Sequence, residues 1–449
     1  MHRQGLWPSC IATTHHSFSG ETTMKQGLLA ASIMLGLAGL TASGSSVAAP
    51  AADRFLDVIV TLNAGASGHS RADNRALAAE VARQHGVAAS HTYGKVLTGF
   101  AARVPEAALD RLRADPMVAN IEFDREMHAV MGKPGGGGGG GAQVTPWGVA
   151  RVGANSNSND GAGIHIYIID TGIDSDHPDL AAHIGNGFAP VACKGRVCNQ
   201  SWDDDNGHGS HVAGSAAAID NSTGVVGVAP GATLHAIKVL SSQGSGSISG
   251  IIAGIDWMTA EVSARGQAAV ANMSLGGGGS KTGTCTSSGF SGTDTFHQAI
   301  CNAKNAGVVF AVAAGNDGAD AQASTPAAYD DAVITVSATD SNDNWPTWSN
   351  WGDGNPGGVS APVAIAAPGV SILSTWNNGG TNTISGTSMA SPHVAGAAAL
   401  YLKSHPQATN GSAFSNTLNG LLAASESTAT FNNTSGHPHD EGFLDAGTL

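Results

Sequence analysis

The sequence predicts an α/β protein with a doubly wound, mostly parallel sheet, preceded by a small α+β domain. From residue 142 onward, continuous apolar runs such as 164–169 and 308–313 alternate with helix-like segments. Runs of this length are typical of strands buried on both faces, as in a parallel sheet covered by helices. Residues 53–128 have a different pattern, with two helical segments among four strand-like ones. At 449 residues the chain is long enough for both parts.

The N-terminal residues 1–49 are predicted to be a signal region for export. Met24 and Lys25 precede a short apolar run, and small residues at 47–49 provide a cleavage site. This run is short for a membrane span, and no later run is long enough to cross a bilayer. We therefore expect a secreted, soluble protein. The residues before Met24 lack this pattern, so Met24 is the expected start and Cys10 is set aside with them.

Residues 53–128 are expected to fold in the order strand, helix, strand, strand, helix, strand. This is the order of the ferredoxin-like split unit. The segments are a strand at 55–62, a helix at 71–84 ended by Gly86, two strands on either side of Gly99, a helix opened by Pro105, and a strand at 118–124.

A glycine run separates the two folded parts. It occupies residues 135–141 and is expected to be flexible. We interpret residues 129–141 as a linker and maturation region, and residues 142–449 as the main domain.

Three segments of the main domain supply the residue types of a nucleophilic serine site. A serine hydroxyl needs an imidazole to accept its proton and a carboxylate to orient that imidazole. We therefore expect Ser388 as nucleophile, His208 as general base and acid, and Asp170 as the orienting group. The segments are Asp170-Thr171-Gly172, His208-Gly209-Ser210-His211 and Gly386-Thr387-Ser388-Met389-Ala390-Ser391-Pro392.

Each segment alone also has an ordinary structural interpretation. The first could be a turn, the second could open a helix or hold a metal through two histidines, and the third could be a loop. Their context favours chemistry, because Asp170 ends an apolar strand, where open α/β sheets place their sites. His208 and Ser388 each begin a run of small residues, so both are expected at helix starts, with Pro392 tolerated in the first turn.

The order and flanking residues of these segments resemble those of the subtilisin-like serine proteases, the subtilase family of the subtilisin and proteinase K type. The resemblance covers roughly residues 55–449. Within the small domain, residues 97–101 and 115–118 are similar to the propeptide inhibitor of that family. The resemblance implies a monomeric, secreted serine endopeptidase that hydrolyses proteins through an acyl-enzyme. It also implies a precursor that matures itself and whose residues 53–128 inhibit the enzyme and assist its folding.

Two other classes of protein fit less well. An α/β-hydrolase esterase would carry Gly-x-Ser-x-Gly and the order Ser, Asp, His, whereas Ser388 lies in Gly-x-Ser-x-Ala. A catalytically inactive binding module would be expected to lose one of the chemical residues, and none is lost here.

The resemblance also implies an oxyanion site and a substrate cleft. Asn316 follows a buried-strand run that ends in Gly315, and it is expected to hold the oxyanion together with the Ser388 amide. A substrate would bind as an added strand between two segments. Small residues at 276–277 and 313–315 leave room for a large apolar side chain before the scissile bond, and segment 323–329 is closer to the proteinase K branch. The expected substrate-binding residues are Ser274, Leu275, Gly276, Gly246 and Ile248.

A structural calcium ion is a further expectation from the family pattern. Ala142 and Gln143 resemble a mature N-terminus, so we expect cleavage between Gly141 and Ala142, after which Gln143 can reach the ion. Oxygen ligands suit calcium, but a turn without metal remains an alternative. The expected ligands are Gln143, Asp179, Ile219, Asn221, Thr223 and Val225.

Four cysteines remain after Cys10, and an exported protein is expected to pair them. Local pairing of Cys193 with Cys198 leaves Cys285 with Cys301, the simplest of three connectivities. A zinc site would favour Cys-x2-Cys spacing, which is absent.

The charge is strongly acidic, at −14 for the chain, with 23 acidic and 8 basic residues in 142–449. Such a surface argues against binding to nucleic acid or to anionic membranes and is compatible with calcium.

Overall fold

The computed structural model describes residues 54–63, 70–130, 141–195, 198–352 and 362–449. The chain divides into two compact units, Met1–Ala52 and Asp53–Leu449, and all described residues belong to the second. The predicted signal region, Met24, Cys10 and most of the glycine run lie outside the described residues.

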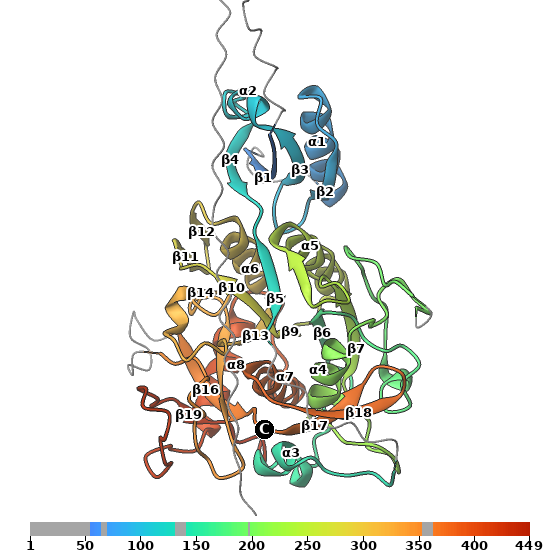
Figure 1. The fold of residues 1–449 in the computed structure, drawn as a ribbon, viewed down its shortest axis with the longest axis vertical. Coiled ribbons are helices and arrows are strands. Elements are labelled where there is room, and N and C mark those ends of the chain that lie inside the picture. The colour runs from blue at the N-terminus through green and yellow to red at the C-terminus, as the bar shows by residue number, and fades with distance from the viewer. Residues whose placement is uncertain (1–53, 64–69, 131–140, 196–197, 353–361) are drawn as a thin grey trace, which may run out of the picture. The chain divides into compact units, whose positions relative to one another are not determined.

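A seven-stranded parallel sheet forms the centre of the main domain, in the order β19-β16-β15-β13-β9-β6-β7 (Figure 1). The chain passes from β6 to β7 on one side and then crosses to β9 on the other, so the topology reverses at β6. The carboxyl end of a strand at such a switch point is where open sheets bind ligands. The strands are β6 His165–Asp170, β7 Thr233–Lys238, β9 Ala269–Met273, β13 Val308–Ala313, β15 Ile334–Thr339, β16 Val363–Pro368 and β19 Gly442–Phe443.

Helices cover both faces of this sheet (Figure 1), which confirms the predicted fold class. Along β6, Ile166 and Ile168 pack into one apolar core while Tyr167 and Ile169 pack into another, because successive side chains of a strand point to opposite faces. Helices α4, α7 and α8 contribute to the first core, and α5 and α6 contribute to the second. The helices are α3 Trp147–Arg151, α4 His208–Ala217, α5 Ile248–Arg265, α6 Thr295–Asn305, α7 Thr387–Ser404 and α8 Ser412–Ala424.

The small domain has the predicted ferredoxin-like order of elements. Its four strands form an antiparallel sheet in the order β2-β3-β1-β4, with its own apolar core. The second helix starts later than expected, because a short 3-10 turn follows Pro105 before the α-helix begins. The elements are β1 Phe55–Leu62, α1 Arg71–Gln84, β2 Ala89–Tyr93, β3 Gly99–Pro105, η1 Glu106–Ala108, α2 Leu109–Arg113 and β4 Val118–Phe123.

A second four-stranded sheet, in the order β14-β10-β5-β8, joins the small domain to the main domain. Strand β5, at the C-terminal end of the small domain, lies between two strands of the main domain (Figure 1). Its strands are β5 Glu126–Ala129, β8 Ser245–Ser247, β10 Leu275–Gly278 and β14 Ser324–Thr325. The remaining elements are two hairpins and three short turns. The hairpins are β11 Gly283–Thr286 with β12 Gly289–Gly292 and β17 Ile372–Trp376 with β18 Gly380–Ile384. The turns are η2 Ala154–Ser156, η3 Ala181–His183 and η4 Ala321–Ala323.

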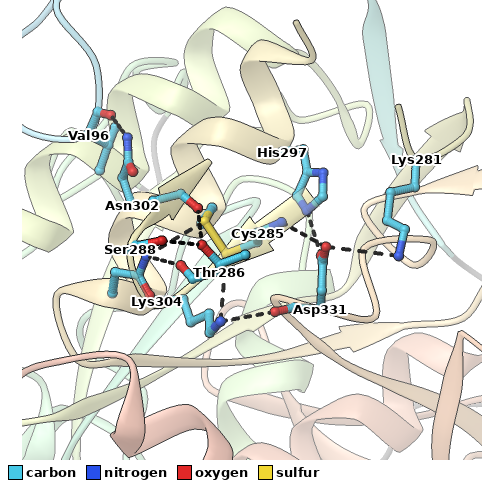
Figure 2. The surroundings of a disulfide bond; sticks show 12 residues. Val96, Lys281, Cys285, Thr286, Ser288, His297, Asn302, Lys304 and Asp331 are labelled. Atoms are coloured by element: carbon cyan, nitrogen blue, oxygen red, sulfur yellow. Dashed lines mark hydrogen bonds and ion pairs between the residues drawn. A yellow bond between two sulfur atoms is a disulfide. The ribbon is translucent and has the colours of Figure 1, made fainter. Parts of the chain in front are cut away.

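Both predicted disulfides are present, Cys193–Cys198 and Cys285–Cys301. The second joins the β11–β12 hairpin to α6 (Figure 2). Asp331 supports the same hairpin, accepting hydrogen bonds from Cys285 N at 2.8 Å and His297 Nε2 at 2.7 Å. The disulfide thus connects the hairpin to α6. Asn302 of this helix donates a hydrogen bond of 2.7 Å to Val96 O of the small domain.

Among the helices of the described ranges, none has the length and apolarity needed to cross a membrane.

Candidate active site

Asp170 and His208 form a buried hydrogen bond at the carboxyl edge of the central sheet. Asp170 ends β6 and His208 begins α4. Asp170 Oδ1 lies 2.8 Å from His208 Nδ1, and neither side chain is exposed. The same oxygen accepts a hydrogen bond of 2.7 Å from Thr171 N, so the carboxylate is held in one orientation. His208 Nε2 is buried and makes no hydrogen bond to any residue that the structure describes, which leaves it available to accept a proton.

Glycine is required immediately before His208. Gly207 has a φ of 114°, and a Cβ there would lie 2.2 Å from the Trp376 ring. The sharp turn at Gly207 allows α4 to start at His208, so the imidazole comes from a rigid helix end.

Ser388 is the second residue of α7, and reciprocal hydrogen bonds tie it to Ser274. Ser388 Oγ donates to Ser274 O at 3.1 Å, and Ser274 Oγ donates to Ser388 O at 2.8 Å. The second bond is possible because Pro392, four residues on, has no N–H to occupy the Ser388 carbonyl. Pro392 was expected in the first turn of the helix, but it lies beyond that turn, in the interior of α7.

Asn316 lies beside the helix that carries Ser388, and its amide is oriented by Thr387. Its Oδ1 accepts hydrogen bonds from Thr387 N at 2.9 Å and from Thr387 Oγ1 at 3.0 Å. The Nδ2 group therefore points away from Thr387, and it donates to Val130 O at 3.1 Å.

Two positioning residues near the site were missed by sequence reasoning. Buried Asp204 accepts hydrogen bonds from Thr171 Oγ1 at 2.9 Å and Ser210 N at 2.9 Å, so one carboxylate joins the turn after Asp170 to the start of α4. Lys238, fully buried, donates to Thr171 O at 2.6 Å. The acidic run at 203–205 was the only signal for this arrangement, and it resembles an ordinary charged loop.

The predicted substrate-binding residues lie along β5. Gly246 pairs with Met127 on one side, and Gly276 pairs with His128 on the other. Met127 is fully buried in the same core as Leu275 and Ile248. Strand β5 thus occupies the cleft in the way that an extended peptide would, and Ser274, Leu275, Gly276, Gly246 and Ile248 all border it.

A cavity of about 490 Å³ opens beside the end of this strand. Val130 and Asn316 both line it. Its other walls are mostly small residues, which include the expected ranges 276–277 and 313–315 together with Ala323 and Ala327 of the segment 323–329.

Asp256 of α5, whose side chain is buried, accepts several hydrogen bonds from the small domain. Asp256 Oδ1 accepts from the backbone N–H groups of residues 94–96 at 3.0, 2.5 and 3.0 Å. Its Oδ2 accepts two hydrogen bonds from Arg71, at 3.1 and 2.9 Å. Farther along the interface, Asp124 accepts from Ser249 N at 3.0 Å at the start of α5, which suits the helix dipole.

The six predicted calcium ligands gather in one place. Asp179 is buried, and its two oxygens accept from Asn221 Nδ2 at 3.0 Å and from Val225 N at 2.8 Å. Gln143 Nε2 lies 2.9 Å from Ile219 O and 3.4 Å from Val225 O. Thr223 pairs with Ala142 through a β-bridge. Side-chain and backbone oxygens are the ligands that calcium prefers, but in this structure the side-chain nitrogens of Gln143 and Asn221 face the neighbouring oxygens.

Two titratable groups close to the site have shifted pKa values because they are buried. Burial lowers the pKa of His211 to about 3, so this histidine is neutral at physiological pH. Burial also raises the pKa of Asp174 to about 6, and the neighbouring Asp176 adds to the effect. Asp174 Oδ2 accepts a hydrogen bond of 2.9 Å from Gly379 N.

Comparison with known proteins identifies the two folded parts. The model of the subtilase family matches residues 161–442, and the model of the peptidase inhibitor I9 family matches residues 57–129. The chain is 42% identical to an extracellular serine proteinase of Thermus sp. (strain Rt41A) over 334 residues, 72% of this chain and 71% of that protein. It is 38% identical to subtilisin NAT of Bacillus subtilis subsp. natto over 322 residues, 70% and 73% of the two chains. A solved structure of a cold adapted subtilisin-like serine proteinase matches with a TM-score of 0.53 and 34% identity, covering 67% of this chain and 97% of that chain.

Proposed function

Because the chain belongs to the subtilase family of serine endopeptidases and carries a propeptide inhibitor domain, we propose that Asp170, His208 and Ser388 form its catalytic triad. The observation that carries the proposal is the buried 2.8 Å contact between Asp170 Oδ1 and His208 Nδ1, together with the lack of a hydrogen-bond partner for Nε2 among the described residues. An imidazole held in this way has one nitrogen fixed as donor and the other free as base.

Ser388 attacks the scissile carbonyl once its hydroxyl turns from Ser274 O toward His208 Nε2. His208 accepts the proton and later delivers it to the leaving amine, while Asp170 stabilises the imidazolium. Asn316 Nδ2 and the Ser388 amide stabilise the oxyanion. The hydrogen bond from Asn316 to a carbonyl in the cleft supports this role.

The proposed substrates are proteins that bind as an added strand between β8 and β10. The pairing of β5 with both strands supports this mode of binding. The cavity beside Val130 supports a tolerant preference for a large apolar residue before the scissile bond, because each methylene in such a pocket changes binding by about 1–3 kcal/mol.

We further propose a structural calcium ion and export from the cell. Calcium, when bound, would link the N-terminal segment at Gln143 to the loop 219–225 through oxygen ligands. The six expected ligand residues lie together around Asp179 and the loop 219–225, and this clustering supports the site. The proposal of export rests on the predicted signal region and on the extracellular location named for the Thermus relative.

A sulfonyl fluoride tests the proposed nucleophile. Wild-type protein freed of its small domain should lose activity and gain one covalent adduct, which peptide mass spectrometry should place on Ser388. His208→Ala should react far more slowly. An adduct on another serine, with activity lost, would contradict the assignment.

A further inference from the structure

The small domain and the N-terminal segment of the main domain are both docked in the uncleaved chain. Ten residues, 131–140, lie between Val130, which follows β5, and Gly141, which precedes the main domain. The carbonyl that lies at Ser388 in the uncleaved chain therefore indicates which peptide bond is cleaved first.

Val130 lies at the nucleophile. Its N–H donates to Ser274 O at 3.2 Å, and the same carbonyl accepts the Ser388 hydroxyl at 3.1 Å. Its own carbonyl accepts the Asn316 Nδ2 hydrogen bond at 3.1 Å. One residue thus contacts both the carbonyl that holds the nucleophile and the proposed oxyanion donor. The residues before it belong to the ladder of β5, where Ala129 pairs with Leu275 and His128 with Gly276.

Gly141 is held elsewhere, although the family pattern places the cleavage directly after it. Its carbonyl accepts a hydrogen bond of 3.2 Å from Gly224 N. Beyond it, Gln143 N donates to Ser222 O at 3.1 Å and Val144 N donates to Gly224 O at 2.8 Å. The Gly141 carbonyl is therefore committed to the loop 219–225 and not to Asn316.

Both contacts hold at once in the uncleaved chain, in which eleven Cα to Cα steps join Val130 to Gly141. Gln143 was expected to reach the calcium loop only after cleavage. That expectation is wrong, because the intact chain already places Gln143 Nε2 2.9 Å from Ile219 O.

We propose that the first self-cleavage breaks the bond that follows Val130, eleven residues before the N-terminus that the family pattern indicates. This inference rests on the proposed triad. Ser388 Oγ bonds to the Val130 carbonyl carbon, the bond from that carbon to the next nitrogen breaks, and His208 passes the hydroxyl proton to the leaving amine. Water then hydrolyses the ester, which frees Ser388 and leaves Val130 as a carboxylate. The new main-domain chain begins with Met131 and carries residues 131–141 ahead of Ala142.

The test follows the full-length chain during self-processing, by intact mass and N-terminal sequencing. The first new N-terminus should be Met131, and any Ala142 terminus should appear later. Val130→Asp should slow the first cut at least tenfold, because it places a charge in a cavity lined mostly by small residues. Gly141→Asp is the matched control and should process at the wild-type rate, since a Cβ at Gly141 would have no atom within 4 Å.

An Ala142 terminus as the first product would overturn the proposal, as would a block by Gly141→Asp with normal processing of Val130→Asp. Val130→Leu, which keeps an apolar side chain, should still yield Met131, so the inference stays testable if the aspartate variant does not fold. Failure of the proposed triad gives a different result: the wild-type precursor would stay uncleaved and would not react with the sulfonyl fluoride.

Discussion

Thr387 holds the side chain of Asn316 by two hydrogen bonds to its amide oxygen, at 2.9 Å from the backbone N–H and 3.0 Å from Oγ1. The residue before the proposed nucleophile thus orients the proposed oxyanion donor. Thr387 Oγ1 also accepts a hydrogen bond of 3.0 Å from Gly315 N, which connects the start of α7 to the turn after β13.

Replacing Asn316 by alanine should lower kcat about 10²–10³-fold with little change in KM, the range that the same kind of donor shows in subtilisin. Thr387→Val should lower kcat by a smaller factor, because the backbone hydrogen bond remains. Thr387→Ser keeps the hydroxyl and should stay near wild type. Steady-state kinetics on one peptide substrate compare the three variants, and equal activity of the valine and serine variants would exclude a role for Oγ1.

Removal of the nucleophile should stop maturation. Ser388→Ala is expected to accumulate as an uncleaved precursor without proteolytic activity, since loss of the nucleophile in subtilisin costs about 10⁶ in kcat. Gel analysis of the purified variant, incubated with no other protease, measures the outcome. Adding a trace of active enzyme serves as the control. Normal processing of the variant by itself would refute self-cleavage.

Local patterns were sufficient to place Asp170, His208 and Ser388 on their elements, but not to predict the contacts that orient them. The apolar run 164–169 placed Asp170 at a sheet edge, and small-residue runs placed His208 and Ser388 at helix starts. Thr387 contacts Asn316 across 71 positions, and Ser274 contacts Ser388 across 114. Contacts between such distant residues depend on the packing of the whole domain, and no local pattern encodes them.

The position of Val130 was missed for the same reason. The predicted small domain ended at residue 128, whereas β5 runs to Ala129 and Val130 continues into the site. Which residue of this segment reaches Asn316 depends on the register of β5 between β8 and β10, and a register is fixed only when the strands pair.

Asp256 should control how long the small domain inhibits the enzyme. Asp256→Asn removes the charge that faces three backbone N–H groups and the Arg71 guanidinium. Hydrogen bonds to charged groups are worth about 1.5–3 kcal/mol each, so the inhibited complex should dissociate at least tenfold faster. The lag between cleavage and the appearance of activity measures this.

Glu261→Gln is the matched control for Asp256→Asn. Glu261 lies on the same helix, but its partners are Asn186 and Arg265 of the main domain. An unchanged lag in Asp256→Asn, or an equal change in both variants, would argue against a specific role for Asp256.

Calcium should stabilise the precursor as well as the mature enzyme, because Gln143 already lies at the loop in the intact chain. In the uncleaved Ser388→Ala protein, a chelator should lower the melting temperature, since an ion that binds only the folded state stabilises it by mass action. Asp179→Asn should abolish this shift, and the exposed Asp160→Asn should not. A chelator shift seen only after cleavage would restore the requirement for a free N-terminus, and no shift in either form would exclude a stabilising calcium.

Asp174 should make the stability of the folded chain fall as pH rises from about 4 to about 6. Its pKa is raised by burial from 3.8 to about 6, so within this window the folded state keeps a proton that the unfolded state has lost. This loss of stability is complete above about pH 6, and it is absent below the pKa that Asp174 has in the unfolded chain. Asp174→Asn keeps an acceptor for Gly379 N but carries no charge, and should therefore be more stable than the parent by on the order of 1–3 kcal/mol at pH 8 and equal to it near pH 4. Thermal melts in the Ser388→Ala background avoid self-digestion, and Asp160→Asn provides the exposed control. A constant difference at all pH values would mean that the amide acts by packing and not by removing a buried charge.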